Sequence, residues 1–146
     1  MLLVNNEKND LKIYVDREPH ITVKNPRHYS KEEMKKPYLN KTRVMFTIFY
    51  KEEQYVICCD KGYDWDGASI PFGFRWIIGA KGSPQFLVPS MVHDKLCENH
   101  HFIKNDRYLS SLILRELLIA YGVGKIKATT MFHAVDNFQK VCGGWR

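Results

Sequence analysis

The residues best suited to chemistry are the carboxylates of one glycine-containing turn and a histidine–aspartate step that follows it. Asp64 and Asp66 lie in the run from Gly62 to Pro71, and His93 and Asp94 are adjacent within an apolar stretch. An imidazole can act as a general base or a metal ligand, and a neighbouring carboxylate can orient it or hold a cation. The sequence therefore predicts His93, Asp94 and Asp66 as catalytic candidates.

The same residues could instead hold a metal ion. Asp64, Asp66, His93 and Asp94 would together offer three carboxylates and one imidazole, a set that favours a divalent cation such as Ca²⁺, Mg²⁺ or Mn²⁺. A purely structural role is the alternative, because an Asp followed by Gly67 suits a tight turn in which the carboxylate accepts backbone N–H groups. A buried histidine can likewise serve only to satisfy backbone groups.

A second metal arrangement overlaps the first. His93, Cys97 and either His100 or His101 would share one face of a helix, a spacing that could present three zinc ligands. The fourth ligand of such a site is unassigned.

Composition indicates one folded domain over residues 1–146. The 146 residues are 45% hydrophobic and 13% aromatic, enough for a single core. No stretch approaches the roughly 20 apolar residues of a membrane span, and the first residues lack a signal-peptide pattern, so we expect the protein to stay inside the cell that makes it. Four cysteines without paired short spacing are expected to be free thiols in a reducing compartment: Cys58, Cys59, Cys97 and Cys142.

The formal charge of +6 is concentrated between Lys24 and Lys51. Such a segment could contact nucleic acid, lipid headgroups or an acidic partner, although a solvated lysine-rich loop is the simpler interpretation. The binding candidates within it are Lys31, Lys35, Lys36 and Arg43.

The elements that must position these residues change type midway along the chain. Alternating or β-branched stretches predict two hairpins in the first sixty residues, a flexible start over 1–9 and a basic insertion over 25–41 that is irregular or briefly helical. The hairpin strands are expected at residues 11–15 with 20–24, and at 43–50 with 54–60.

The second half of the sequence favours helices. Capping residues and apolar spacing predict a short turn and then about three helices, so the fold class expected is α+β, with antiparallel strands first and the helices packed against the sheet. The expected bounds are 69–78 for the turn, 85 or 89 to 101, 105 or 106 to 121, and 125–141 for the helices.

Three motifs resemble one known family. The run Asp66–Pro71, the step His93-Asp94 and the segment Met131–Val135 are similar to the domain-of-unknown-function 1353 family, which is widespread in phages and prophages. The resemblance covers roughly residues 10–146. The family pattern continues with an Arg and then an Ala-Asp pair; Arg107 matches the Arg, but Ser110-Ser111 replaces the pair. An Asp that could serve as a ligand or a partner of His93 is therefore missing.

The resemblance implies a phage-encoded accessory or virion-associated protein of the tail or of assembly. In this interpretation the Asp/His-Asp cluster is structural and the basic segment docks a phage structural protein or a host protein, with nucleic acid as a further candidate partner. The protein would lie in the cytoplasm of the infected or lysogenic host, or in the virion. The alternative is a small hydrolase of ester or amide bonds in which His93 is the base and Asp66 and Asp94 hold a divalent cation or orient the histidine.

Overall fold

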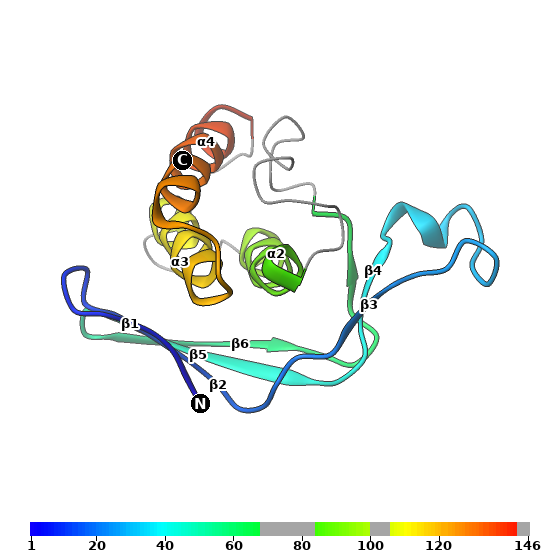
Figure 1. The fold of residues 1–146 in the computed structure, drawn as a ribbon, viewed down its shortest axis with the longest axis horizontal. Coiled ribbons are helices and arrows are strands. Elements are labelled where there is room, and N and C mark those ends of the chain that lie inside the picture. Colours follow the sequence, from blue (N-terminus) through cyan, green and yellow to red (C-terminus); the bar gives the residue numbers. More distant parts are fainter. Residues whose placement is uncertain (68–83, 100–105, 143–146) are drawn as a thin grey trace.

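The computed structural model describes residues 1–67, 84–99 and 106–142 and confirms the α+β class, with antiparallel strands followed by helices (Figure 1). A main sheet has the strand order β1-β2-β5-β6, and a small sheet has the order β3-β4-β7. The elements are β1 (Leu2–Asn6), β2 (Leu11–Val15), β3 (Ile21–Val23), the 3₁₀ turn η1 (Glu33–Lys35), β4 (Tyr38–Asn40), β5 (Val44–Tyr50), β6 (Glu53–Cys59), β7 (Asp64–Trp65), α2 (Pro84–Glu98), α3 (Asp106–Ala120) and α4 (Lys125–Cys142).

The predicted second hairpin is confirmed as β5 and β6. Val44 pairs with Cys59 and Tyr50 with Glu53, so the two strands are in register along their whole length. Their residues alternate between the buried and the open face of the sheet, as the period of two in the sequence requires. Cys58 and Cys59 accordingly point to opposite faces, and both are free thiols.

The predicted first hairpin is wrong. Strand β2 pairs with β1 and β5, whereas β3 pairs with β4 in the small sheet. The difference follows from burial: Leu11, Ile13 and Val15 of β2 are buried, but Thr22 and Val23 of β3 are exposed. Only β2 therefore has an apolar face to place in the main core, and residues 16–20 carry the chain from one sheet to the other.

The start of the chain is an edge strand, not a flexible segment as expected for residues 1–9. Met1 and Val15 exchange two hydrogen bonds, one from the N-terminal ammonium to the Val15 carbonyl at 2.9 Å and one from the Val15 N–H to the Met1 carbonyl at 2.9 Å. Val4 is buried in the core and β1 contacts α3. The apolar residues at the start thus have a place to pack, which fixes the strand.

The helices lie together on one face of the main sheet, with α3 contacting both α2 and α4 (Figure 1). This packing confirms the expectation of about three helices against the sheet. Helix α3 is apolar nearly all round, as a central helix must be, and α2 begins at Pro84, so that Pro89 lies inside it. The turn predicted at 69–78 lies outside the described residues. Within the ranges that the structure describes, no helix is long and apolar enough to cross a bilayer.

The opposite face of the main sheet carries large apolar side chains that are at least partly exposed. Tyr14 and Phe49 form an edge-to-face pair there, with ring centroids 5.8 Å apart, and Met45 and Val56 are also exposed. The helices are therefore confined to one side of this sheet in the described structure.

Candidate functional site

His93 points into the core from α2 and has no exposed surface. Both of its ring nitrogens lie 3.9 Å from the Sγ atom of Cys97, one helical turn later. Burial lowers the pKa of the His93 imidazole from 6.5 to about 4, because a low-dielectric environment disfavours the charged ring. The side chain is thus neutral at neutral pH. Of the predicted zinc ligands, the structure brings His93 and Cys97 together, while His100 and His101 lie outside the described residues.

Asp94 connects α2 to the turn after β7. Its side chain is nearly buried, and its Oδ2 atom accepts a hydrogen bond from the N–H of Gly67 at 3.0 Å. Gly67 has a φ of +74°, and a Cβ atom at this position would lie 3.3 Å from the Phe86 ring. Glycine is therefore favoured by the left-handed backbone conformation, and a side chain here would press against the Phe86 ring of α2.

A second hydrogen bond joins the same two segments. The Trp65 indole N–H donates to Ser90 Oγ at 2.9 Å, and Ser90 donates in turn to the Leu87 carbonyl at 3.0 Å. Residues 65–67 are thus held on α2 by two hydrogen bonds, one to the neutral side chain of Ser90 and one to the carboxylate of Asp94. The Asp-Gly turn and the His-Asp step are in contact through the Gly67 N–H and the Asp94 carboxylate, and this hydrogen bond braces the turn on α2.

The carboxylate of Asp64 forms an ion pair with a lysine of the same chain. Its Oδ2 atom lies 2.8 Å from Lys24 Nζ, whose side chain is only 4% exposed, while that of Asp64 is 37% exposed. Lys24 also donates to the Glu33 carbonyl at 2.9 Å. Across residues 1–67, 84–99 and 106–142, no three His, Cys, Asp or Glu side chains gather closely enough to hold a metal ion. The four predicted ligands, including the partly buried Asp66, do not form such a cluster in this part of the chain.

A carboxylate does reach the position where the resemblance leads one to expect an Asp. Ser111 is buried on α3 and its hydroxyl donates to Asp136 Oδ1 at 3.3 Å, from α4. Arg107 pairs with the same oxygen at 2.6 Å. Asp136 of α4 thus contacts both Arg107 and Ser111 of α3 and joins the two helices.

The predicted basic segment divides into parts with different surroundings. Lys24 is turned inward, and Arg43 pairs with Asp60 at 3.3 Å beside the β5–β6 strands. The other three binding candidates lie on the loop between β3 and β4, which we call the basic arm and define as residues 25–37. Its exposed basic residues are Arg27, Lys31, Lys35 and Lys36.

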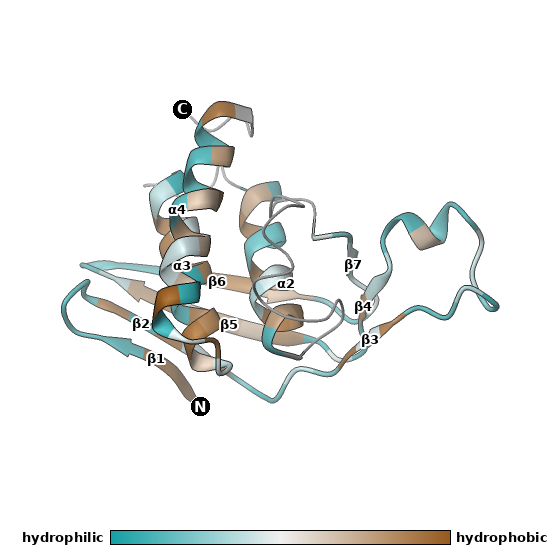
Figure 2. Ribbon diagram, turned by 45° about the horizontal axis from the view of Figure 1, so that its top comes forward, coloured by the Kyte–Doolittle hydropathy of each residue, from teal (hydrophilic) through white to brown (hydrophobic). Residues whose placement is uncertain are grey.

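The basic arm is an ordered loop that projects beyond the rest of the fold and is predominantly hydrophilic (Figures 1 and 2). Ser30 and Glu33 exchange reciprocal hydrogen bonds, from the Ser30 N–H to Glu33 Oε1 at 2.9 Å and from the Glu33 N–H to Ser30 Oγ at 3.1 Å. The bond from the Ser30 N–H lowers the pKa of the Glu33 carboxyl. At the base of the arm, Lys24 fixes the chain to Asp64 of β7.

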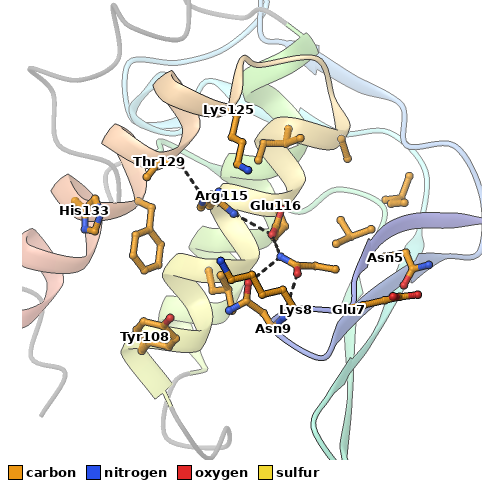
Figure 3. Close-up of a pocket in the computed structure, with 17 residues that line it drawn as sticks. Asn5, Glu7, Lys8, Asn9, Tyr108, Arg115, Glu116, Lys125, Thr129 and His133 are labelled. Atoms are coloured by element: carbon orange, nitrogen blue, oxygen red, sulfur yellow. Dashed lines mark hydrogen bonds and ion pairs between the residues drawn. The ribbon is translucent and has the colours of Figure 1, made fainter.

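Sequence reasoning missed a cleft between the β1–β2 turn and helices α3 and α4 (Figure 3). Glu116 lies at its inner wall and is nearly buried, and its Oε1 atom accepts hydrogen bonds from the Asn6 side chain and from Arg115 Nη1. Arg115 Nε donates to Thr129 Oγ1 at 2.9 Å, and Asn6 also donates to Asn9 Oδ1 at 2.9 Å. A continuous polar chain therefore crosses the cleft from the N-terminal strands to α4.

One signal for this network is present in the sequence. Arg115 and Glu116 are adjacent charges within a helix that is otherwise apolar nearly all round, and charged residues are seldom buried without a partner. The partner from β1 could not be found in this way, because Asn6 is 110 residues away from Glu116 along the chain.

Comparison with known proteins shows a match to a family. The pattern of a family described as "Protein of unknown function (DUF1353)" matches residues 42–135, from just before β5 into α4. No curated protein and no solved structure matches the chain. The matched segment contains the His93-Asp94 step and the Arg115–Glu116 pair, whereas the basic arm and strand β1 precede it.

Proposed function

This chain belongs to the DUF1353 family, whose description assigns no activity, and we propose from its geometry that it is an accessory protein that docks an acidic protein partner through the basic arm. Consistent with the resemblance of its motifs, we place it among phage or prophage proteins of the tail or of assembly. It would act in the cytoplasm of the bacterial host and could be carried in the virion.

The observation that carries this proposal is the basic arm itself. Its four exposed basic residues stand on a loop whose own hydrogen bonds hold it in shape, and Lys24 anchors its base. A preformed loop loses little conformational freedom on binding, which favours association. Among the described residues, Lys35 pairs with Glu32 at 2.9 Å, and no ion pair is made by Arg27, Lys31 or Lys36.

The chemistry of the basic arm suits a protein partner better than nucleic acid. Glu32 and Glu33 lie among its basic residues, and two acids on the arm would face the phosphates of a duplex unfavourably. Its aromatic residue Tyr29 is engaged with Lys24, whose Nζ atom lies 5.4 Å from the ring centroid. A partner surface that is acidic but interspersed with basic or polar groups would complement this pattern.

Reversing three charges on the basic arm should weaken partner binding. We expect the triple variant Lys31→Glu, Lys35→Glu, Lys36→Glu to bind an acidic probe, a fluorescent glutamate-rich peptide, roughly tenfold or more weakly than the unchanged protein, with a reduced dependence on salt. Fluorescence anisotropy at two salt concentrations measures both effects. Particles of the encoding phage, purified and analysed by mass spectrometry, should contain the protein but not the triple variant.

The matched control changes the same number of charges elsewhere. Lys12, Lys61 and Lys140 are exposed and lie outside the arm, so their replacement by Glu should leave peptide affinity and virion incorporation close to those of the unchanged protein. Equal weakening by both triple variants would assign the effect to net charge and refute docking by the arm. Tighter binding to a DNA duplex than to the peptide would replace the protein partner with nucleic acid.

The described geometry gives less support to a hydrolase. His93 has no exposed surface through which to reach a substrate, Asp94 accepts the Gly67 N–H, and Asp64 neutralises Lys24. A general base must come within hydrogen-bond reach of the proton that it abstracts. We therefore propose docking in preference to hydrolysis by His93, Asp66 and Asp94, with or without a divalent cation.

A further inference from the structure

The cleft beside α3 has the size and construction of a ligand site. Its volume is about 820 Å³, within the range of small-molecule pockets. Three separate parts of the chain form it: β1 with the turn that follows, one side of α3, and the first half of α4. A cleft assembled in this way is not a by-product of one loop, because each wall belongs to a different packed element.

The inner polar wall of the cleft is held in a fixed arrangement. Glu116 accepts bonds from Asn6 and Arg115, and Arg115 is held from its other side by Thr129. The guanidinium is thereby oriented before any ligand arrives, which reduces the loss of side-chain freedom on binding. Guanidinium groups held in this manner are suited to carboxylates and phosphates.

Positive charge exceeds negative charge around the cleft. Lys8 of the β1–β2 turn, Arg115 of α3 and Lys125 of α4 line it, against the two acids Glu7 and Glu116. Glu116 pairs with Arg115, and within the described part of the chain neither Lys8 nor Lys125 forms an ion pair. An anion entering the cleft would therefore meet ammonium groups that need not give up an existing partner.

One part of the lining is apolar. Leu112 and Ile119 of α3 and Phe132 of α4 contribute to the lining, and Tyr108 packs edge-to-face on Phe132 with ring centroids 5.6 Å apart. Tyr108 and Lys125 lie toward opposite ends of the cleft (Figure 3). Arg115 follows Tyr108 by two helical turns, about 10 Å along α3, so an apolar chain of roughly eight carbons could span the distance between them.

We propose that this cleft binds a small amphipathic anion, with a carboxylate near Arg115 and Lys125 and an aliphatic body along α3 toward Tyr108. The carboxylate of the ligand pairs with Arg115 and Lys125, and its aliphatic body packs against the apolar lining. This site is separate from the basic arm, and its occupant is a small molecule, whereas the arm docks a macromolecule.

Octanoate is the probe that tests the proposal, with 1-octanol and acetate as its neutral and headgroup-only counterparts. Calorimetry should show saturable binding of octanoate and much weaker binding of both counterparts. Lys125→Glu should weaken octanoate binding roughly tenfold, because an attraction becomes a repulsion. Tyr108→Ala should weaken octanoate binding but leave the response to acetate unchanged.

The matched control is Lys127→Glu, an exposed charge reversal two residues further along α4 that does not line the cleft. It should bind octanoate as the unchanged protein does, and circular dichroism should show all three variants folded. The absence of saturable octanoate binding, or equal affinity in Lys125→Glu and Lys127→Glu, would overturn the proposal. If octanol bound as tightly as octanoate, the cleft would recognise only the apolar body of the ligand, and this result would overturn the proposed anion specificity.

Discussion

On acidification, this protein should unfold at a higher pH than a variant that lacks His93. The pKa of the buried imidazole is lowered from 6.5 to about 4, so between these two pH values the unfolded chain takes up a proton that the native state does not. Above this window the ring is neutral in both states and contributes no pH dependence. Between neutral pH and about pH 4.5, the free energy of unfolding should fall by roughly 2–3 kcal/mol through this residue alone.

Urea unfolding at several pH values measures this effect. His93→Gln keeps a polar side chain of similar size without a titrating ring, so its stability should fall less on acidification than that of the unchanged protein. His28→Gln removes an exposed histidine of the basic arm and serves as the matched control, with a pH profile like that of the unchanged protein. Parallel profiles for His93→Gln and the unchanged protein would show that the imidazole is protonated in the native state and contradict its burial.

Loss of Asp64 should destabilise the fold more than loss of Lys24, although Asp64 is the more exposed partner. Asp64→Ala leaves the Lys24 ammonium in a site where only 4% of its side chain is exposed, with the Glu33 carbonyl as a neutral acceptor. Lys24→Met instead fills the buried volume and leaves a carboxylate that is 37% exposed to water. We expect a loss of about 2–3 kcal/mol for Asp64→Ala and about 1 kcal/mol for Lys24→Met, because an unpaired buried charge is the larger penalty.

The double variant Lys24→Met, Asp64→Ala separates this interpretation from simple loss of an ion pair. Once the ammonium is gone, removal of the carboxylate should have little further effect, so the double variant should be more stable than Asp64→Ala alone. Chemical denaturation of the four proteins under the same conditions supplies the comparison. Additive losses in the double variant would mean that the two residues act independently and that Lys24 does not anchor the basic arm through Asp64.

Local patterns in the sequence predicted most elements but not all of their partners. The β5–β6 hairpin and the bounds of α3 and α4 follow from periodicity and capping, which act over a few residues. The pairing of β2 with β5 joins segments separated by residues 16–43, and nothing local distinguishes it from pairing with β3. The edge strand β1 forms a local hairpin with β2, but its sequence from Leu2 to Asn6 lacks the alternation typical of a strand, and its contact with α3 joins residues about a hundred positions apart.

The candidate site shows the same limit. The sequence places Asp66 near a turn and His93 on a helix, and the approach of these two segments, made by Asp94 and the Gly67 N–H, could be anticipated from the motifs. Whether the imidazole faces the core or the solvent depends on the packing of α2, which fixes its burial and therefore its pKa. The ion pair between Asp64 and Lys24 could not be predicted, because the sequence of a basic segment does not show that one of its lysines turns inward.

The family-matched segment and the surfaces proposed for binding overlap only in part. Residues 42–135 include the α3 and α4 walls of the cleft, but the basic arm and the residues of β1 lie before residue 42. Helices α3 and α4 thus supply two walls of the cleft and the Arg115–Glu116 pair, and the first forty residues add the basic arm and the third wall. Both proposals depend on this N-terminal portion, which is where substitutions would alter recognition without disturbing the helices.

The order of strands in the main sheet also bears on how the protein folds. Closing the two-residue turn between β5 and β6 is cheaper in chain entropy than bringing β2 to β5 across about 28 residues, by about 2 kcal/mol. We therefore expect the local β5–β6 and β1–β2 hairpins to form before β2 pairs with β5, and amide hydrogens of the edge strand β1 to exchange sooner than those of the internal strand β5. The wall of the cleft that carries Asn6 and Lys8 would then reach its place only when the β1–β2 hairpin docks on β5.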